Sequence, residues 1–184
     1  LKEIGQPHRQ LRVIHIAGTN GKGLSALMLG KLLISEGKSC GIFSSPHLTD
    51  IRERICLNGE WISQTEFTDC AEEVLKSAQV ISKESYLSYF DMLTAIALLA
   101  FQRTGMSRVI LETGLGGKAD STNVTEKELL KEWGEDSENI TVLSAVDIDS
   151  NYLIYSILTD ATISDFSLRF IFHLLKNRIL ASSI

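Results

Sequence analysis

The sequence has little of what marks secreted, nucleic-acid-binding or membrane-spanning proteins. It holds three cysteines among 184 residues, with neither a CxxC pair nor a Cys/His cluster, so a disulfide framework and a zinc site are both unexpected. Its net charge of −5 argues against general nucleic-acid binding, which usually needs a basic face. The apolar run Met92–Phe101 is about half as long as a bilayer-spanning helix. We therefore expect a cytoplasmic protein with no nucleic-acid and no membrane partner.

The sequence also lacks internal repeats, low-complexity segments and a visible signal peptide. It begins with Leu1 rather than Met, which suggests that a segment precedes it. The composition, 44% hydrophobic and 22% charged, is that of an ordinary globular protein, and the length suits one domain with a sizeable core.

Short β-branched runs alternate along the chain with segments that carry apolar residues at helical spacing. The pattern opens with a strand, a glycine-rich turn, a helix that stops at Gly37 and a second strand. Such a βαβ unit predicts an α/β fold, a mainly parallel sheet with flanking helices. A long loop at residues 45–61 should close in a hairpin at Asn58-Gly59. The expected strands are residues 12–17, 39–44, 107–112 and 140–147, and the expected helices are residues 24–36, 64–82 and 89–103.

Two stretches fit this alternation less well. Residues 126–139 are acidic and are expected to form a surface insertion or a short helix. Residues 151–184 contain no glycine-rich turn and no motif, although residues 166–180 have the spacing of an amphipathic helix.

The glycine-rich turn Gly18–Gly23 has the features of a phosphate-binding loop. It follows a strand and precedes a helix, so its backbone N–H groups and the helix N-terminus can face an anion. Lys22 adds a full positive charge that can follow a phosphoryl group during transfer. The loop is not the common GxxxxGK[ST] form, because Ile16 and Gly23 stand at two of its defining positions. The alternative is a plain turn of a doubly wound protein.

Polar residues at the ends of two expected strands are candidates for the same site. Glu112 follows an apolar strand and should lie at the carboxyl edge of the sheet, where open α/β folds bind ligands. Ser45 follows another strand, but a turn serine before Pro46 would look the same. Glu112 could equally be a strand-end carboxylate that faces solvent. His15, inside an apolar strand, is expected to be a buried histidine with a hydrogen-bond partner.

Four motifs in order resemble the folylpolyglutamate synthase/dihydrofolate synthase family, which is related to the Mur ligases. Together they cover about residues 1–150, and four ordered motifs are far more specific than one. They are AGTNGKG at residues 17–23, SPHL with ERI and NG at residues 45–59, YFD-x-LTA at residues 89–95, and E-x-GLGG with D-x-TN at residues 112–123.

The resemblance implies that the chain is part of an ATP-dependent ligase. The implied fold is a P-loop or Rossmann-like domain similar to the central domain of a Mur ligase, but incomplete. The family joins the amine of L-glutamate to a carboxylate of dihydropteroate or a folate through an acyl phosphate. ATP and Mg²⁺ are the implied cofactors, and the small-molecule substrates are the implied partners. Lys22 and Glu112 would be catalytic, and Ser45 and Glu112 would bind the metal. The implied ATP-binding residues are Gly18, Thr19, Asn20, Gly21, Lys22, Gly23 and Leu24, and the implied substrate-binding residues are His47, Tyr89, Phe90, Asp91, Lys118 and Asp120.

Alternatives remain open for two of these residues. Phe90 could be a core residue at helical spacing instead of a stacking partner for the pterin. His47 could touch substrate or only shape its loop.

The sequence departs from the family pattern at several positions. Leu24 replaces a Ser or Thr, Lys118 replaces the usual Arg, and Ser150 replaces a histidine that would hold a second metal. No match extends beyond Ser150, and we expect these 184 residues to lack the second domain of the family. We therefore expect an ATP-binding domain at residues 1–150, a divergent tail at residues 151–184 and no turnover by this chain alone. The rival hypotheses are a Mur-type or other nucleotide-dependent ligase, and an inactive truncated nucleotide-binding fragment.

Overall fold

The computed structural model describes residues 1–18, 21–81, 86–115, 120–124 and 140–144. The described strands form one six-stranded sheet in the order β4-β3-β2-β5-β1-β6. Strands β2, β5, β1 and β6 run parallel, whereas β3 and β4 are antiparallel to their neighbours. The mainly parallel sheet expected from the sequence is therefore confirmed. The strands are β1 (Val13–Ala17), β2 (Cys40–Phe43), β3 (Ile55–Leu57), β4 (Glu60–Trp61), β5 (Arg108–Glu112) and β6 (Ile140–Ser144).

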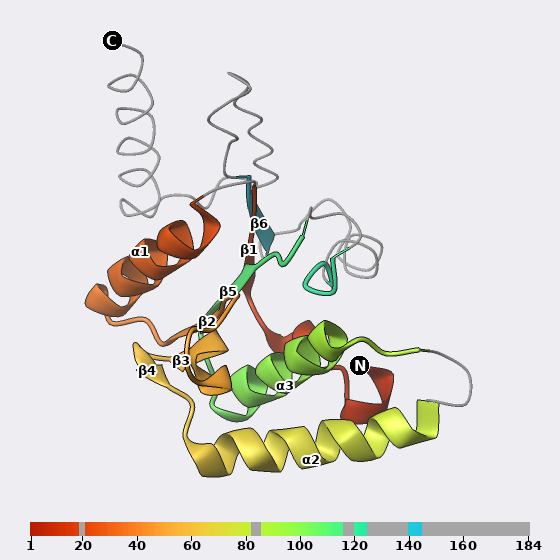
Figure 1. Cartoon of the computed structure of the whole chain (residues 1–184). Coiled ribbons are helices and arrows are strands. Elements are labelled where there is room, and N and C mark those ends of the chain that lie inside the picture. The colour runs from red at the N-terminus through yellow and green to blue at the C-terminus, as the bar shows by residue number, and fades with distance from the viewer. Residues whose placement is uncertain (19–20, 82–85, 116–119, 125–139, 145–184) are drawn as a thin grey trace.

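Helices cover the two faces of the sheet unequally. Figure 1 shows α1 on one face and α3 on the other, with α2 packed outside α3. Strand alternation produces this division, since Ile110 packs under α1 while its neighbours Val109 and Leu111 join the cluster that includes α3. The helices are α1 (Lys22–Ser35), α2 (Gln64–Ile81) and α3 (Tyr89–Arg103), with short 3-10 helices η1 (Lys2–Ile4), η2 (Pro7–Gln10) and η3 (Ile51–Arg54). No helix among the described residues is both long and apolar enough to cross a membrane.

The ends of α1 depend on glycines with positive φ. Gly21, at φ 77°, precedes the helix, so the chain turns directly from the loop into α1 at Lys22. The helix therefore begins two residues before the expected start. Gly37, at φ 76°, donates its backbone N–H to the carbonyl of Ile34 and ends the helix as expected.

The loop after β2 ends in a hairpin that joins the sheet. Asn58 at φ 53° and Gly59 at φ 95° form the two-residue turn expected between β3 and β4. The Asn58 side chain also accepts a hydrogen bond from the backbone N–H of Cys40 at 2.8 Å. The hairpin thereby extends the sheet beyond β2, which the sequence did not predict.

Several expectations fall on residues that the structure does not describe. They include the acidic segment 126–139, the last residues of the strand expected at 140–147, Ser150 and the tail at residues 151–184.

The cysteines Cys40, Cys56 and Cys70 are free thiols.

Candidate active site

Three chain segments meet where the parallel strands end. The glycine-rich turn leaves β1 and enters α1, Ser45 follows β2, and Glu112 is the last residue of β5. Parallel strands end on the same side of the sheet, and open α/β folds bind ligands at that edge. The placement of Ser45 and Glu112 at the carboxyl edge is therefore as expected, while their role as metal ligands stays a prediction.

Glu112 is the buried centre of this edge, with only 4% of its surface exposed. Its Oε2 accepts a hydrogen bond from the backbone N–H of Ser45 at 3.1 Å. Burial raises the pKa of the Glu112 carboxyl above its ordinary value. Hydrogen bonds from the Ser45 and Gly23 backbones and the positive charge of Lys22 act in the opposite direction, with a smaller effect. The alternative of a strand-end carboxylate that faces solvent is therefore wrong.

Gly23 brings the turn of the phosphate loop against this carboxylate. A Cβ atom added to Gly23 would lie 3.3 Å from Oε2 and 3.4 Å from Oε1 of Glu112. Such contacts are tight, so a side chain at residue 23 would press on the carboxylate. Because Gly23 stands where the common phosphate loop has Ser or Thr, no side chain at this position separates the start of α1 from the Glu112 carboxylate.

The donor set at this edge suits a hard cation. A serine hydroxyl and a carboxylate are oxygen ligands of the kind that Mg²⁺ prefers. Among the described residues, no group of three or more His, Cys, Asp or Glu side chains could hold a metal ion. A cation here would therefore need oxygens from a nucleotide or from water in addition to Ser45 and Glu112.

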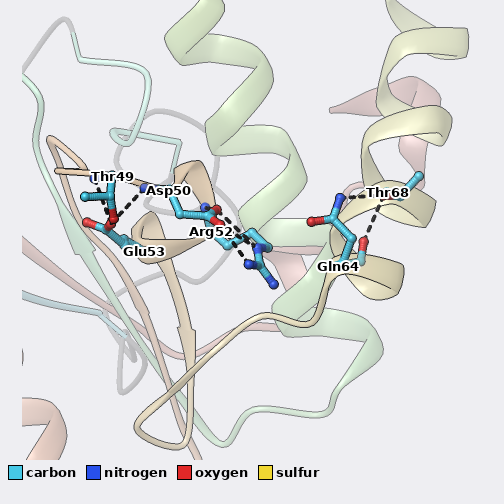
Figure 2. A network of polar contacts seen from close by, with 6 residues as sticks. All are labelled: Thr49, Asp50, Arg52, Glu53, Gln64 and Thr68. Carbon is cyan, nitrogen blue, oxygen red and sulfur yellow. Dashed lines mark hydrogen bonds and ion pairs between the residues drawn. The ribbon is translucent and has the colours of Figure 1, made fainter.

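The loop after β2, residues 44–54, which we call the β2 loop, is organised by one carboxylate. Glu53 accepts hydrogen bonds from the backbone N–H groups of Leu48, Thr49 and Asp50 at 2.8–2.9 Å, and from the Thr49 hydroxyl at 2.7 Å. These bonds, led by that from Leu48, lower the pKa of Glu53 from 4.5 to about 2. Figure 2 shows Glu53 with Thr49 and Asp50, beside the ion pair of Asp50 with Arg52. The Arg52 Nη2 lies 2.7 Å from the Asp50 carboxylate.

The same loop holds His47 through its neighbour Arg54. The Arg54 Nε donates a hydrogen bond to Nδ1 of His47 at 2.7 Å, and both side chains are partly buried. The backbone carbonyl of Arg54 also accepts from the N–H of Ser44 at 3.0 Å, which closes the root of the loop.

The described part of the loop after β5, residues 113–115 and 120–124, is organised by Asp120; we call it the β5 loop. Asp120 Oδ2 accepts from the backbone N–H groups of Gly114 and Leu115, both at 2.9 Å. Its Oδ1 accepts from the backbone N–H of Thr122 at 3.0 Å and from the Thr122 hydroxyl at 2.5 Å. Asp120, expected to bind the pterin, therefore shapes its own loop in this structure, and the substrate contact stays a prediction.

Thr122 connects this loop to the core of the sheet. Its hydroxyl lies 2.8 Å from Nε2 of His15, which is buried in β1. Because the single Thr122 hydroxyl proton is donated to Asp120, His15 must donate from Nε2. The expectation of a buried histidine with a partner is thus confirmed.

The residues expected to meet the pterin lie near the start of α3. Tyr89 is 55% exposed and free to reach a ligand. The Phe90 ring lies 5.6 Å from the Phe43 ring, and a Cβ atom on Gly114 would come within 2.9 Å of it. Phe90 therefore packs between the core and the β5 loop, which favours the core alternative.

Asp91 also has a structural role. Its Oδ2 accepts from the backbone N–H of Ser88 at 2.8 Å, and its own N–H donates to the Ser88 hydroxyl oxygen at 3.1 Å, which together form the capping box that starts α3. Its Oδ1 accepts from the Ser121 hydroxyl at 2.6 Å, which ties the β5 loop to the helix. Substrate binding by Asp91 stays a prediction.

The remaining expected site residues are placed only in part. Leu24 is 56% exposed on α1. Thr19, Asn20 and Lys118 lie outside the described residues, so the phosphate loop is described only at Gly18 and from Gly21 onward.

Sequence reasoning missed the organising roles of Glu53 and Arg54, as well as that of Asp120. A local signal exists for Asp120, because Asp followed two residues later by Thr is typical of a turn in which the side chain caps the backbone. The pairing of Arg54 with His47 has no such signal, since it depends on how the β2 loop folds to bring together two residues seven positions apart.

Comparison with known proteins agrees with the motifs. The chain matches no protein-family profile. It is 36% identical to the dihydrofolate synthase/folylpolyglutamate synthase of Bacillus subtilis over 145 residues, which are 76% of this chain and 34% of that protein. FolC of E. coli in complex with DHPP and ADP aligns at a TM-score of 0.61 and 31% identity, covering 79% of this chain and 33% of that one.

A third relative was solved with a nucleotide analogue and a metal ion. The bifunctional folylpolyglutamate synthase/dihydrofolate synthase of Yersinia pestis, complexed with AMPPNP and Mn ion, aligns at a TM-score of 0.58 and 31% identity. The alignment covers 77% of this chain and 32% of that one. The chain thus spans about a third of the length of these relatives. Over the part that matches, it belongs to the folylpolyglutamate synthase/dihydrofolate synthase family, of whose members it spans the N-terminal part.

Proposed function

We propose that this chain provides the nucleotide-binding part of an ATP-dependent ligase that joins L-glutamate to dihydropteroate or a folate. The observation that carries the proposal is the convergence of Gly23 and Ser45 on the buried carboxylate of Glu112. The relatives solved with ADP or with AMPPNP and Mn ion support it.

The chain's residues have distinct parts in this reaction. The start of α1 offers backbone N–H groups and a partial positive charge to the terminal phosphates of ATP. Lys22, the first residue of α1, adds a full charge that stabilises the phosphoryl group as it moves to the substrate carboxylate. The glutamate amine then attacks the acyl phosphate and forms the amide, with inorganic phosphate as the leaving group.

Ser45 and Glu112 are the residues that would hold Mg²⁺. Their hard oxygen donors fit the ion, and the Glu112 carboxylate already lies against the turn that would face the phosphates. A bound metal would neutralise negative charge during phosphoryl transfer. Because no group of three or more His, Cys, Asp or Glu side chains among the described residues could hold a metal ion, affinity for the metal should depend on the nucleotide.

Calorimetry of Mg·ATP binding tests the proposal. For these 184 residues we expect a dissociation constant nearer ~1 mM than ~1 μM, a gap of roughly 4 kcal/mol, because they span only about a third of the length of the relatives. Lys22→Ala should abolish the binding heat. Lys31→Ala, on an exposed turn of the same helix, is the matched control and should bind like the wild type. Equal heats from wild type and Lys22→Ala would show that the loop is not a phosphate site.

An assay of glutamate-dependent ADP release separates the remaining candidates. A folate ligase responds to dihydropteroate or tetrahydrofolate, and a Mur-type ligase responds to UDP-linked substrates. We expect no measurable turnover from the 184-residue chain, because a site left open to water loses the gains of domain closure. Turnover above about a hundredth of a typical ~10 s⁻¹ would contradict this expectation.

A further inference from the structure

The contact between Arg54 and His47 fixes the chemistry that the imidazole can offer. An arginine Nε always carries a proton and can only donate a hydrogen bond. The ring nitrogen that it meets at 2.7 Å, Nδ1 of His47, must therefore be an unprotonated acceptor. A neutral imidazole with a bare Nδ1 carries its proton on Nε2. His47 is thus held as an Nε2–H donor.

The position of Arg54 links its hydrogen bond with His47 to the carboxyl edge of the sheet, where Glu112 lies. Arg54 ends η3, and its carbonyl is bonded to the N–H of Ser44 at the root of the β2 loop. The next residue, Ser45, donates its own N–H to Glu112. His47 lies two residues further along the same loop, so the imidazole is fixed relative to the Glu112 carboxylate through a short, bonded stretch of chain.

We infer that Arg54 is a positioning residue that holds His47 as an N–H donor toward an anionic oxygen of the substrates. The inference rests on the proposed function and deepens it. The oxygen belongs either to the carboxylate of the folate-type substrate or to the terminal phosphate of ATP. His47 is not placed to take a proton from the glutamate amine, because a base needs a free ring lone pair and Arg54 occupies that of Nδ1.

The tautomer can be read directly. Long-range ¹H–¹⁵N spectra of the wild-type chain, at mildly alkaline pH where an ordinary imidazole is neutral, should show His47 only as the Nε2–H form. Arg54→Met removes the donor but keeps an apolar stem, and it should give a mixture of the two tautomers. A protonated Nδ1 in the wild type would overturn the inference, and so would an unchanged spectrum in Arg54→Met.

Two variants of His47 test the donor. The amide nitrogen of Gln reaches close to the place of Nε2, whereas that of Asn lies near Nδ1. His47→Asn should lose about tenfold or more in affinity for one ligand, and His47→Gln should keep most of it, since a hydrogen bond to a charged group contributes on this scale. The ligands are Mg²⁺ with AMPPNP in one arm and dihydropteroate in the other, and the arm that loses affinity identifies the oxygen.

The other outcomes count against the inference. Equal losses in both variants, or no loss from either variant in either arm, would overturn it. Lys22→Ala separates this failure from that of the proposed function. If Lys22→Ala weakens nucleotide binding while both His47 variants match the wild type, only the inference fails. If the wild type binds neither ligand, the proposed function fails and the inference fails with it.

Discussion

The β2 loop and the β5 loop are each organised by one carboxylate, and in the β5 loop the hydrogen bonds of this carboxylate lead on to the core of the sheet. In each, one carboxylate accepts four hydrogen bonds from its own loop, at Glu53 and at Asp120 respectively. The bonds of Glu53 stay within a loop near the surface. Those of Asp120 continue through Thr122 to His15 in the central strand β1. A similar local motif should therefore matter more for stability where it reaches the core.

The largest expected effect is that of Asp120→Ala. It removes all four bonds and leaves the buried Thr122 hydroxyl without its acceptor, so the free energy of unfolding should fall by about 2–4 kcal/mol. Urea denaturation of the nucleotide-free chain measures this. Glu53→Ala is the matched variant in the other loop and should shift the midpoint less. Equal shifts would break the comparison between the loops.

A smaller difference in stability is expected between variants of Thr122 and Thr49, whose hydroxyls donate to Asp120 and Glu53 respectively. Thr122→Val keeps the shape of the side chain but removes the partner of His15 Nε2, and should cost about 1–3 kcal/mol. Thr49→Val removes a comparable hydroxyl bond to Glu53 in an exposed position, where water can replace it. Thermal unfolding of the two variants side by side should show a clear drop in Tm only for Thr122→Val.

The pH dependence of stability should have opposite signs at Glu112 and Glu53. Burial raises the pKa of Glu112, so the folded state binds its proton more tightly than the unfolded state does. Stability from this group is present below its unfolded value of 4.5 and is lost as pH rises toward the folded pKa. Glu112→Gln should therefore become more stable relative to the wild type as pH rises through that interval.

Glu53 has a lowered pKa, about 2 against 4.5, and the sign reverses. Its contribution is present above 4.5 and is lost as pH falls toward 2, so the deficit of Glu53→Gln should shrink in that range. Urea midpoints at a series of pH values give both slopes. Parallel slopes for the two variants would contradict the assigned environments.

The sequence predicted most elements because their signals are local. The helix α3 has the expected bounds, since a serine cap and a continuous apolar stretch define it. Pairing between distant segments left no such trace. The hairpin joins the sheet because Ile42 pairs with Cys56, and β1 lies between β5 and β6. Local periodicity can reveal neither of these two strand pairings.

The candidate site was predictable to a similar degree. The place of Glu112 at the sheet edge follows from its position after an apolar strand. Its burial against Gly23 depends on how closely α1 approaches β5, which is a matter of packing. The ligand contacts that the resemblance implies for Asp120 and Asp91 stay predictions, while the hydrogen bonds by which both residues shape the protein were not foreseen.

The central place of β1 also governs the order in which the chain can fold. Val13 pairs with Val109 on one side and with Ile140 on the other, so β1 must wait during synthesis for partners that lie about a hundred residues later in the chain. Closing loops of this length is slow, and sheets rich in distant pairings fold in roughly milliseconds to seconds. Until residue 109 has been made, β1 is an apolar segment without either neighbour. During synthesis the β1 segment should therefore need protection against aggregation for longer than a segment of a helical protein whose contacts are local.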